Sequence, residues 1–252
     1  TDGEESLLAE MRSPGLPSSS SSSSRLSETR YAQPALFALE WSLAEMWRAR
    51  GVRPTMVLGH SVGEVAAACV AGVMTMETGM RLATERGRMM QAVPSRGGVM
   101  VAVRASRDAA EAAVAAVAAD MVAGENGAAA SALSELVSVA SVNGPSSVVL
   151  SGAADAVDAV LEKLGGGSNG AQQQQRQGRR LDVSHAFHSP LMGDMRAPFG
   201  ELVSSLELSA NDVALASTVT GRVIPAGPLD LTDVDHWVRQ VSAPALFSAA
   251  VA

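Results

Sequence analysis

The sequence contains a single cysteine, Cys69, among its 252 residues. One cysteine cannot form an internal disulfide, so the composition gives no support for export to an oxidising compartment. The chain also lacks a run of about 18 or more apolar residues, which a membrane span requires, and it does not open with the basic-then-apolar pattern of a signal peptide. We therefore expect no membrane partner and a cytoplasmic location, with an organelle as the alternative.

Basic residues are scarce as well, with 19 Lys and Arg against 26 Asp and Glu and a formal net charge of -7. Nucleic-acid binding requires clustered Lys and Arg that neutralise phosphates, so this acidic balance argues against nucleic acid as the main partner. The chain is 47% apolar and 18% charged, which is typical of a globular protein and too apolar for a disordered one.

Residues 1–30 are expected to be poorly ordered, because seven consecutive serines, Ser18 to Ser24, are typical of a flexible linker. The sequence starts at Thr1 rather than at Met, which we interpret as a sign of a fragment or of a domain cut from a longer chain. Ordered structure is expected from Tyr31 onward, and Pro34 is suited to the first position of a helix that reaches about Arg50.

The next elements predict an α/β unit. The apolar positions of the helix at 34–50 recur at helical spacing: Leu36, Leu39, Leu43 and Trp47. A short buried strand is predicted at 55–58, followed by helices at 64–73 and 76–93. Near the end of the chain we predict helical structure at 190–208, a strand at 213–219, and short helices at 233–241 and 244–252.

The segment 98–183 has a pattern of its own. Strands are predicted at 99–103, 136–142, 147–150 and 179–183, with helices at 106–123 and 154–164 and a hairpin turn at Asn143-Gly144-Pro145. The order strand, helix, strand, strand, helix, strand is that of a split βαβ, or ferredoxin-like, domain. We interpret 98–183 as a small subdomain inserted into a larger α/β unit made of residues 31–97 and 184–252.

Gly59-His60-Ser61-Val62-Gly63 is a G-x-S-x-G pattern between the predicted strand and an alanine-rich helix. This context is what a nucleophile elbow requires, because the glycines permit a tight turn and close packing of the helix on the strand. Ser61 would then lie at a helix N-terminus, where backbone N–H groups favour developing negative charge. The alternative is an ordinary strand-to-helix turn with Ser61 as the N-cap.

A serine nucleophile needs a base, and the sequence has four histidines. The side chain of His60 should diverge from that of the serine on a sharp turn, and His236 could be a packed core residue beside Trp237. His185 and His188 lie where a predicted strand ends and a helix begins, which is where α/β catalytic residues gather. Spacing alone does not choose among them.

Arg86 lies on the apolar stripe of the helix at 76–93, with Leu82, Ala83, Met89 and Met90 at neighbouring helical positions. A buried guanidinium is strongly destabilising unless it is paired. Its partner is either an internal carboxylate or the carboxylate of a ligand, and the residues leave both open.

Five segments together carry a resemblance to a known family: 31–40, 59–64, 85–90, 185–192, and 237–240 with Pro244. In this order and spacing they resemble the malonyl-CoA:acyl-carrier-protein transacylases, most closely the acyltransferase domains of polyketide and fatty acid synthases. The resemblance implies a hydrolase-like α/β core with a parallel sheet and a ferredoxin-like insert. It also implies that the chain works beside neighbouring domains of a multidomain synthase.

The resemblance further implies transfer of a malonyl group from malonyl-CoA to the phosphopantetheine thiol of an acyl carrier protein. Ser61 would become malonylated, with His188 as its base and the backbone N–H of Val62 as one oxyanion donor. Arg86 would hold the malonyl carboxylate in a bidentate pair. Gln240 matches the position whose backbone carbonyl orients the histidine ring. The coenzyme A thioester is a substrate, and no cofactor or metal is expected.

Three further residues, His60, His185 and Phe187, are expected in the substrate site. The segment His185-Ala186-Phe187-His188 resembles the malonyl-type form of its motif, whereas the methylmalonyl-type form reads Tyr-Ala-Ser-His. The Phe187 ring would occupy the space that an α-methyl group needs, so we expect malonyl to be preferred over methylmalonyl.

One departure from the family concerns its first strand and the Gly-Gln-Gly-rich loop that supplies a second oxyanion donor. Neither is found before Tyr31, and losing one donor lowers the rate by about 10²- to 10³-fold. The chain is thus expected to lack the N-terminal strand, and an inactive fragment is one alternative. A serine esterase or thioesterase that uses Ser61 and His236 is another, although such an enzyme has no use for a buried cation at Arg86.

Overall fold

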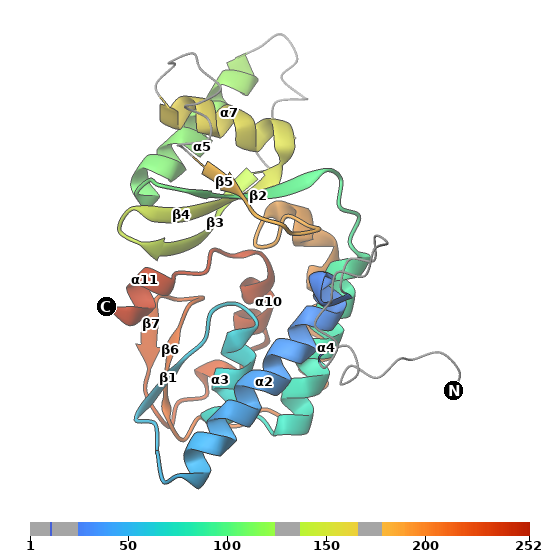
Figure 1. Cartoon of the computed structure of the whole chain (residues 1–252), viewed down its shortest axis with the longest axis vertical. Coiled ribbons are helices and arrows are strands. Elements are labelled where there is room, and N and C mark those ends of the chain that lie inside the picture. Colours follow the sequence, from blue (N-terminus) through green and yellow to red (C-terminus); the bar gives the residue numbers. More distant parts are fainter. Residues whose placement is uncertain (1–10, 12–24, 124–136, 166–177) are drawn as a thin grey trace, which may run out of the picture.

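The computed structural model describes Met11 and residues 25–123, 137–165 and 178–252. The predicted serine linker at 18–24 therefore lies outside the described residues. Figure 1 shows two stacked parts, one built on a three-stranded sheet and the other on a four-stranded sheet. The sequence-based assignment to the α/β class is confirmed by this arrangement of helices and mixed sheets.

The three-stranded sheet has the order β1-β6-β7 and consists of β1 (Met56–Leu58), β6 (Ala214–Ser217) and β7 (Arg222–Ile224). Strands β1 and β6 are parallel, and β6 and β7 are antiparallel. Six α-helices belong to this part: α2 (Thr29–Ala49), α3 (Gly63–Val70), α4 (Met76–Ala92), α9 (Arg196–Ser204), α10 (Val234–Ser242) and α11 (Phe247–Val251). Three short 3-10 helices also belong to it: η1 (Arg25–Ser27), η2 (Pro190–Met195) and η3 (Asp230–Thr232).

The core of this part lies between its helices. Fully buried side chains come from α3, α4, α9 and α10, namely Val65, Leu82, Phe199 and Trp237. Burial of a side chain of this size stabilises the fold by about 1.5–3 kcal/mol. Close packing depends on Gly79 of α4, because a Cβ there would lie 2.3 Å from the Cys69 sulfur.

The four-stranded sheet has the order β3-β4-β2-β5, and all neighbouring strands are antiparallel. Its elements follow one another as β2 (Gly98–Val103), α5 (Arg107–Ala123), β3 (Val137–Gly144), β4 (Ser147–Ala153), α7 (Ala154–Gly165) and β5 (Gly178–Arg180). This is the predicted order of strands and helices, with the predicted hairpin between β3 and β4. The sheet and its two helices share a separate core of mostly valine and alanine side chains.

The two parts are joined by hydrogen bonds as well as by the chain. Ala245, two residues before α11, donates to the carbonyl of Ala140 and accepts from the amide of Val142, both at 2.9 Å. Ala245 thus pairs with strand β3 of the smaller sheet. These contacts fix the position of β3 relative to the larger part.

Helix α2 differs from its prediction in two ways. It begins at Thr29 rather than at Pro34, which lies inside it. The first turn is stabilised by packing on α4, where the Thr29 amide donates to Gln91 Oε1 at 3.1 Å. Residues 25–30, which we expected to be poorly ordered, form η1 and the start of this helix.

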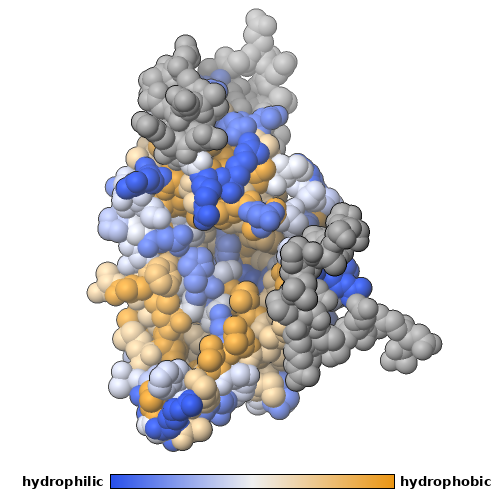
Figure 2. Space-filling model, in the orientation of Figure 1, coloured by the Kyte–Doolittle hydropathy of each residue, from blue (hydrophilic) through white to orange (hydrophobic). Residues whose placement is uncertain are grey.

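The apolar stripe of α2 is the second difference. Its four members are 45–54% exposed: Leu36, Leu39, Leu43 and Trp47. The buried residues of the helix are instead Thr29, Gln33, Pro34, Ala35 and Phe37. Figure 2 shows apolar side chains gathered on the surface of the larger part.

No helix in the described segments is long and apolar enough to cross a membrane. Within the same segments, no three His, Cys, Asp or Glu side chains are grouped so that they could hold a metal ion.

Candidate active site

Ser61 lies in the sharp turn between strand β1 and helix α3, as the G-x-S-x-G pattern predicts. Its backbone has a φ of 54°, a left-handed conformation that non-glycine residues rarely adopt. The turn brings the chain back on itself so closely that a Cβ on Gly59 would lie 2.1 Å from the carbonyl carbon of Gly63. Val62 is the N-cap residue of α3. Its N–H therefore takes no part in the hydrogen bonds within the helix.

Ser61 and His188 form a hydrogen-bonded pair although 127 positions separate them in the sequence. The distance from Ser61 Oγ to His188 Nε2 is 2.8 Å. The Nδ1 atom of His188 lies 2.9 Å from the carbonyl oxygen of Ala243. A carbonyl can only accept, so Nδ1 carries the proton and Nε2 is free to accept from the serine hydroxyl. This is the arrangement of a nucleophile and its general base.

The backbone around His188 is also fixed by hydrogen bonds. Its φ is 54°, like that of Ser61. The hydroxyl of Ser138, on strand β3, donates to the His188 carbonyl at 3.0 Å. The next residue, Ser189, caps η2 by accepting from the Leu191 amide. The pair thus depends on both parts of the molecule.

The expected role of Gln240 is wrong in detail. The carbonyl that orients His188 belongs to Ala243, three residues later. Ala243 follows the last turn of α10 with an extended backbone, which turns its carbonyl away from the helix. Gln240 contributes through its side chain instead, because Nε2 donates to the backbone carbonyl of Ser61 at 3.0 Å. It therefore holds the nucleophile turn rather than the base.

Arg86 reaches the same site from helix α4. It is 1% exposed, its Nη1 donates to Gln33 Oε1 at 2.6 Å, and its Nη2 donates to Ser61 Oγ at 3.2 Å. In the described part of the chain it takes part in no ion pair, and its Nε is buried without a partner there. Burial lowers its pKa to about 10, an effect that the charge of Glu64 opposes. Because this pKa is well above neutral pH, the guanidinium remains charged there.

The environment also keeps the base neutral. His188 is 6% exposed. Burial, together with the positive charge of Arg86 and to a lesser degree His60, lowers its pKa from 6.5 to about 3, while the hydrogen bond to Ala243 acts in the opposite direction. The imidazole is therefore unprotonated near neutral pH and can accept a proton from Ser61.

The other three histidines form their hydrogen bonds with partners other than Ser61. His185 is buried, with Nε2 donating to the Val93 carbonyl and Nδ1 accepting from Ser184, both at 2.8 Å. Both of its ring nitrogens are thus used by the protein. Phe187 is partly buried and packs between the two parts, with its ring 5.9 Å from that of His185.

His60 is exposed, and its Nε2 lies 3.0 Å from the Asn143 side-chain oxygen on β3. This hydrogen bond joins the turn that carries Ser61 to the smaller part of the molecule.

His236 is bound to a buried carboxylate rather than to the serine. Its Nε2 lies 3.0 Å from Oε1 of Glu64, which is fully buried on α3. The same carboxylate accepts from the hydroxyls of Ser217 and Thr218 and from the Thr218 amide. This network anchors α3 to the end of β6 and to α10. It occupies the histidine that the esterase alternative would have used as its base.

Three of these contact residues were missed from the sequence: Gln33, Glu64 and Ala243. Gln33 and Glu64 stand in segments that carry the resemblance, and a polar residue on the buried side of a helix was the available signal. Ala243 acts through its backbone, so its side chain gives no signal.

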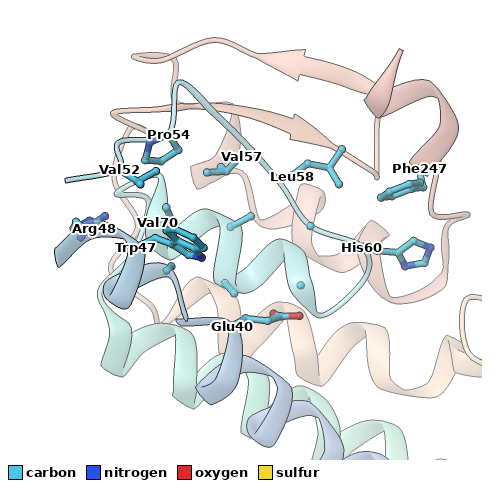
Figure 3. A pocket seen from close by; sticks show the side chains of 15 residues that line it. Glu40, Trp47, Arg48, Val52, Pro54, Val57, Leu58, His60, Val70 and Phe247 are labelled. Carbon is cyan, nitrogen blue, oxygen red and sulfur yellow. The ribbon is translucent and has the colours of Figure 1, made fainter. Parts of the chain in front are cut away.

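A cavity of about 820 Å³ opens on the other side of the turn, between α2, β1 and α3. Figure 3 shows Trp47, Val57 and Leu58 around it, with His60 and Phe247 side by side at one end. Ser61, Arg86 and His188 do not line it. Glu40 does, and burial raises the pKa of this carboxyl group.

Comparison with known proteins identifies the family. A family model described as the acyl transferase domain matches residues 15–252. The chain belongs to the acyltransferase domain family. The polyketide synthase GfsB of Streptomyces halstedii is 42% identical over 226 residues, which is 90% of this chain and 4% of the synthase. The phenolphthiocerol synthesis polyketide synthase Pks15/1 of Mycobacterium marinum is 39% identical over 86% of this chain and 9% of its own length.

Solved acyltransferase structures agree with this family. The acyltransferase domain from the second module of the salinomycin polyketide synthase is 38% identical, with a TM-score of 0.74 over 92% of this chain and 48% of that chain. A malonyl-CoA:acyl carrier protein transacylase of Xanthomonas oryzae is 32% identical, with a TM-score of 0.72 over 90% of this chain and 66% of its own. The chain therefore spans about half to two thirds of these solved acyltransferases and a small part of the synthases.

Proposed function

We propose that this acyltransferase domain transfers a malonyl group from malonyl-CoA to the phosphopantetheine thiol of an acyl carrier protein. The observation that carries the proposal is Arg86, a buried cation without an ion-pair partner among the described residues, hydrogen-bonded to the hydroxyl of Ser61. A malonyl thioester has the matching pattern, with one carboxylate beside its reactive carbonyl. The transacylase relatives are named for this substrate and this acceptor.

The first half-reaction makes a malonyl-serine. Ser61 Oγ attacks the thioester carbon while its proton passes to Nε2 of His188. The N–H of Val62 donates to the oxyanion. The bond between carbon and sulfur then breaks, and the coenzyme A sulfur leaves as a thiol with the proton from His188. Arg86 binds the distal carboxylate throughout, which fixes the acyl group at a charge-assisted, bidentate contact.

The second half-reaction runs the same steps with a different thiol. His188 removes the proton from the phosphopantetheine thiol, whose sulfur attacks the ester carbon. Ser61 leaves and recovers its proton from His188. The acyl carrier protein, neighbouring synthase domains and a cytoplasmic location are part of this proposal, as is the absence of any cofactor beyond the coenzyme A substrate.

We also propose the finer architecture on which the mechanism depends. The order β3-β4-β2-β5 with two helices supports the description of 98–183 as a ferredoxin-like insert. Residues 31–97 and 184–252 then form a hydrolase-like core. Among the described strands, β1 lies at the edge of its sheet, which is compatible with pairing to the N-terminal strand expected from the family.

The direct test is the mass of the intact protein after incubation with malonyl-CoA. An added malonyl group that maps to the peptide containing Ser61, and that is absent from Ser61→Ala, supports the proposal. An adduct that persists in Ser61→Ala contradicts it. Rapid hydrolysis of the adduct without a carrier thiol would favour the thioesterase alternative.

A further inference from the structure

Gln33 is the side chain that holds Arg86 in the site. It lies on the buried side of α2, and its Oε1 accepts from Arg86 Nη1 at 2.6 Å. Its Nε2 donates to Thr29 Oγ1 at 2.7 Å and lies 3.2 Å from the sulfur of Met90. A guanidinium has only donors, so the amide oxygen must face Arg86 and the amide nitrogen must face away. The orientation of this glutamine is thereby determined at both ends.

The neutrality of Gln33 matters as much as its position. A glutamate would make the same contact with Arg86 but would neutralise it, because a buried carboxylate in contact with a guanidinium forms an ion pair. The carboxylate that raises the pKa of Arg86 is Glu64, and its oxygens are bound by Ser217, Thr218 and His236. Arg86 is therefore held in place by a group that leaves its charge available.

We propose that Gln33 is a positioning residue that determines acyl-group selectivity. It places the Arg86 guanidinium beside Ser61 and leaves the carboxylate of the incoming acyl group as the counter-ion. The inference rests on the proposed function, since selectivity is defined by the malonyl group. It adds that a neutral acceptor on α2 is required for Arg86 to select a carboxylate.

Two substitutions at this position separate placement from charge. Gln33→Glu keeps the acceptor and adds a charge, so Arg86 stays in place but is already paired. We expect labelling of Ser61 by malonyl-CoA to fall about 10- to 100-fold relative to labelling by acetyl-CoA. Gln33→Leu removes the acceptor and releases the guanidinium, so the preference for malonyl should fall as well. Gln91→Glu is the matched control, because Gln91 caps the start of α2 without contacting Arg86.

Competition between the two CoA esters, read by mass spectrometry of the Ser61 peptide, gives the selectivity of each variant. Thermal unfolding of the same samples reports whether a variant has lost its fold. A malonyl-to-acetyl ratio in Gln33→Glu equal to that of the unmutated protein would overturn the proposal. Equal losses for both esters in Gln33→Leu, with a lower unfolding temperature, would reduce Gln33 to a structural contact.

Crystal structures of the two variants keep this test separate from the proposed function. If the unmutated protein is not malonylated at Ser61, the proposed function fails, but the position of Arg86 can still be compared. We expect the guanidinium to remain within hydrogen-bond distance of Ser61 in Gln33→Glu and to move away in Gln33→Leu. An unmoved guanidinium in Gln33→Leu would show that other contacts place Arg86, and the proposal would be wrong.

Discussion

Arg86 Nη2 donates to Ser61 Oγ across 3.2 Å, although Arg86 lies on helix α4 and Ser61, the nucleophile of the proposed reaction, lies in the turn between β1 and α3. This contact places a positive charge one hydrogen bond from the atom that would be acylated. An acyl group attached to Ser61 and ending in a carboxylate would therefore meet a buried counter-charge. An acyl group without one would leave the guanidinium unpaired.

The choice of base can be tested by comparing three histidines. His188→Ala should slow labelling of Ser61 far more than His185→Ala or His236→Ala, because only His188 is hydrogen-bonded to the serine hydroxyl. General-base catalysis contributes about 10²- to 10⁴-fold to rate, so that is the expected loss. Rates of adduct formation measured by intact mass provide the comparison. Similar losses in His188→Ala and His236→Ala would point to a different base.

Folding stability should depend on pH through His188. Its pKa in the folded protein is lowered from 6.5 to about 3, so the unfolded chain binds more protons than the folded one between these values. The contribution of neutral His188 to the free energy of unfolding should therefore be fully present above pH 6.5. It should be lost as the pH decreases toward 3. Urea unfolding across this range measures the slope.

The control for that measurement is His188→Gln, which cannot titrate. We expect the variant to lose part of the pH dependence between pH 6.5 and 4 that the unmutated protein shows. A variant with an unchanged slope would mean that other groups cause the dependence. The rate of Ser61 labelling should likewise stay level from pH 8 down to pH 6, because the base remains unprotonated throughout.

Preference for malonyl over methylmalonyl is expected from Phe187. Its ring lies in the segment that ends at His188, where serine would leave more space. Exclusion of one methyl group by such crowding is worth about 1–3 kcal/mol, or roughly 10- to 200-fold. The double change His185→Tyr with Phe187→Ser should relax the preference, at some loss of rate. Labelling by equal amounts of both CoA esters measures it, and equal labelling of the unmutated protein would show that this motif does not set the choice.

The sequence predicted the elements around the site better than their ends. Strand β1, the turn at Ser61 and helix α3 follow from an apolar run, two glycines and an alanine-rich segment, which are local signals. The start of α2 did not follow, because Thr29 is stabilised by a contact with Gln91 on another helix. Strand β7 was also missed, since it has three residues of which two are exposed.

Contacts made by backbone atoms and by distant segments were the least predictable. The residue that orients His188 was placed at Gln240 by resemblance, whereas the structure uses the carbonyl of Ala243. The stripe that includes Leu39 and Trp47 has the periodicity of a core-facing surface, yet these side chains are half exposed. Periodicity reports that one side of a helix is apolar, but not what covers that side.

The central claim is that Arg86 selects an acyl group by its carboxylate, and competition between malonyl-CoA and acetyl-CoA for Ser61 tests it most directly. The peptide containing Ser61 is quantified by mass spectrometry for the unmutated protein, Arg86→Ala and Arg88→Ala, the last being a control at an exposed arginine on the same helix. Loss of a buried charge pair costs about 2–5 kcal/mol, so the malonyl-to-acetyl ratio should fall roughly 30-fold or more in Arg86→Ala and stay unchanged in Arg88→Ala. An unchanged ratio in Arg86→Ala, with both labels reduced alike, would contradict the account.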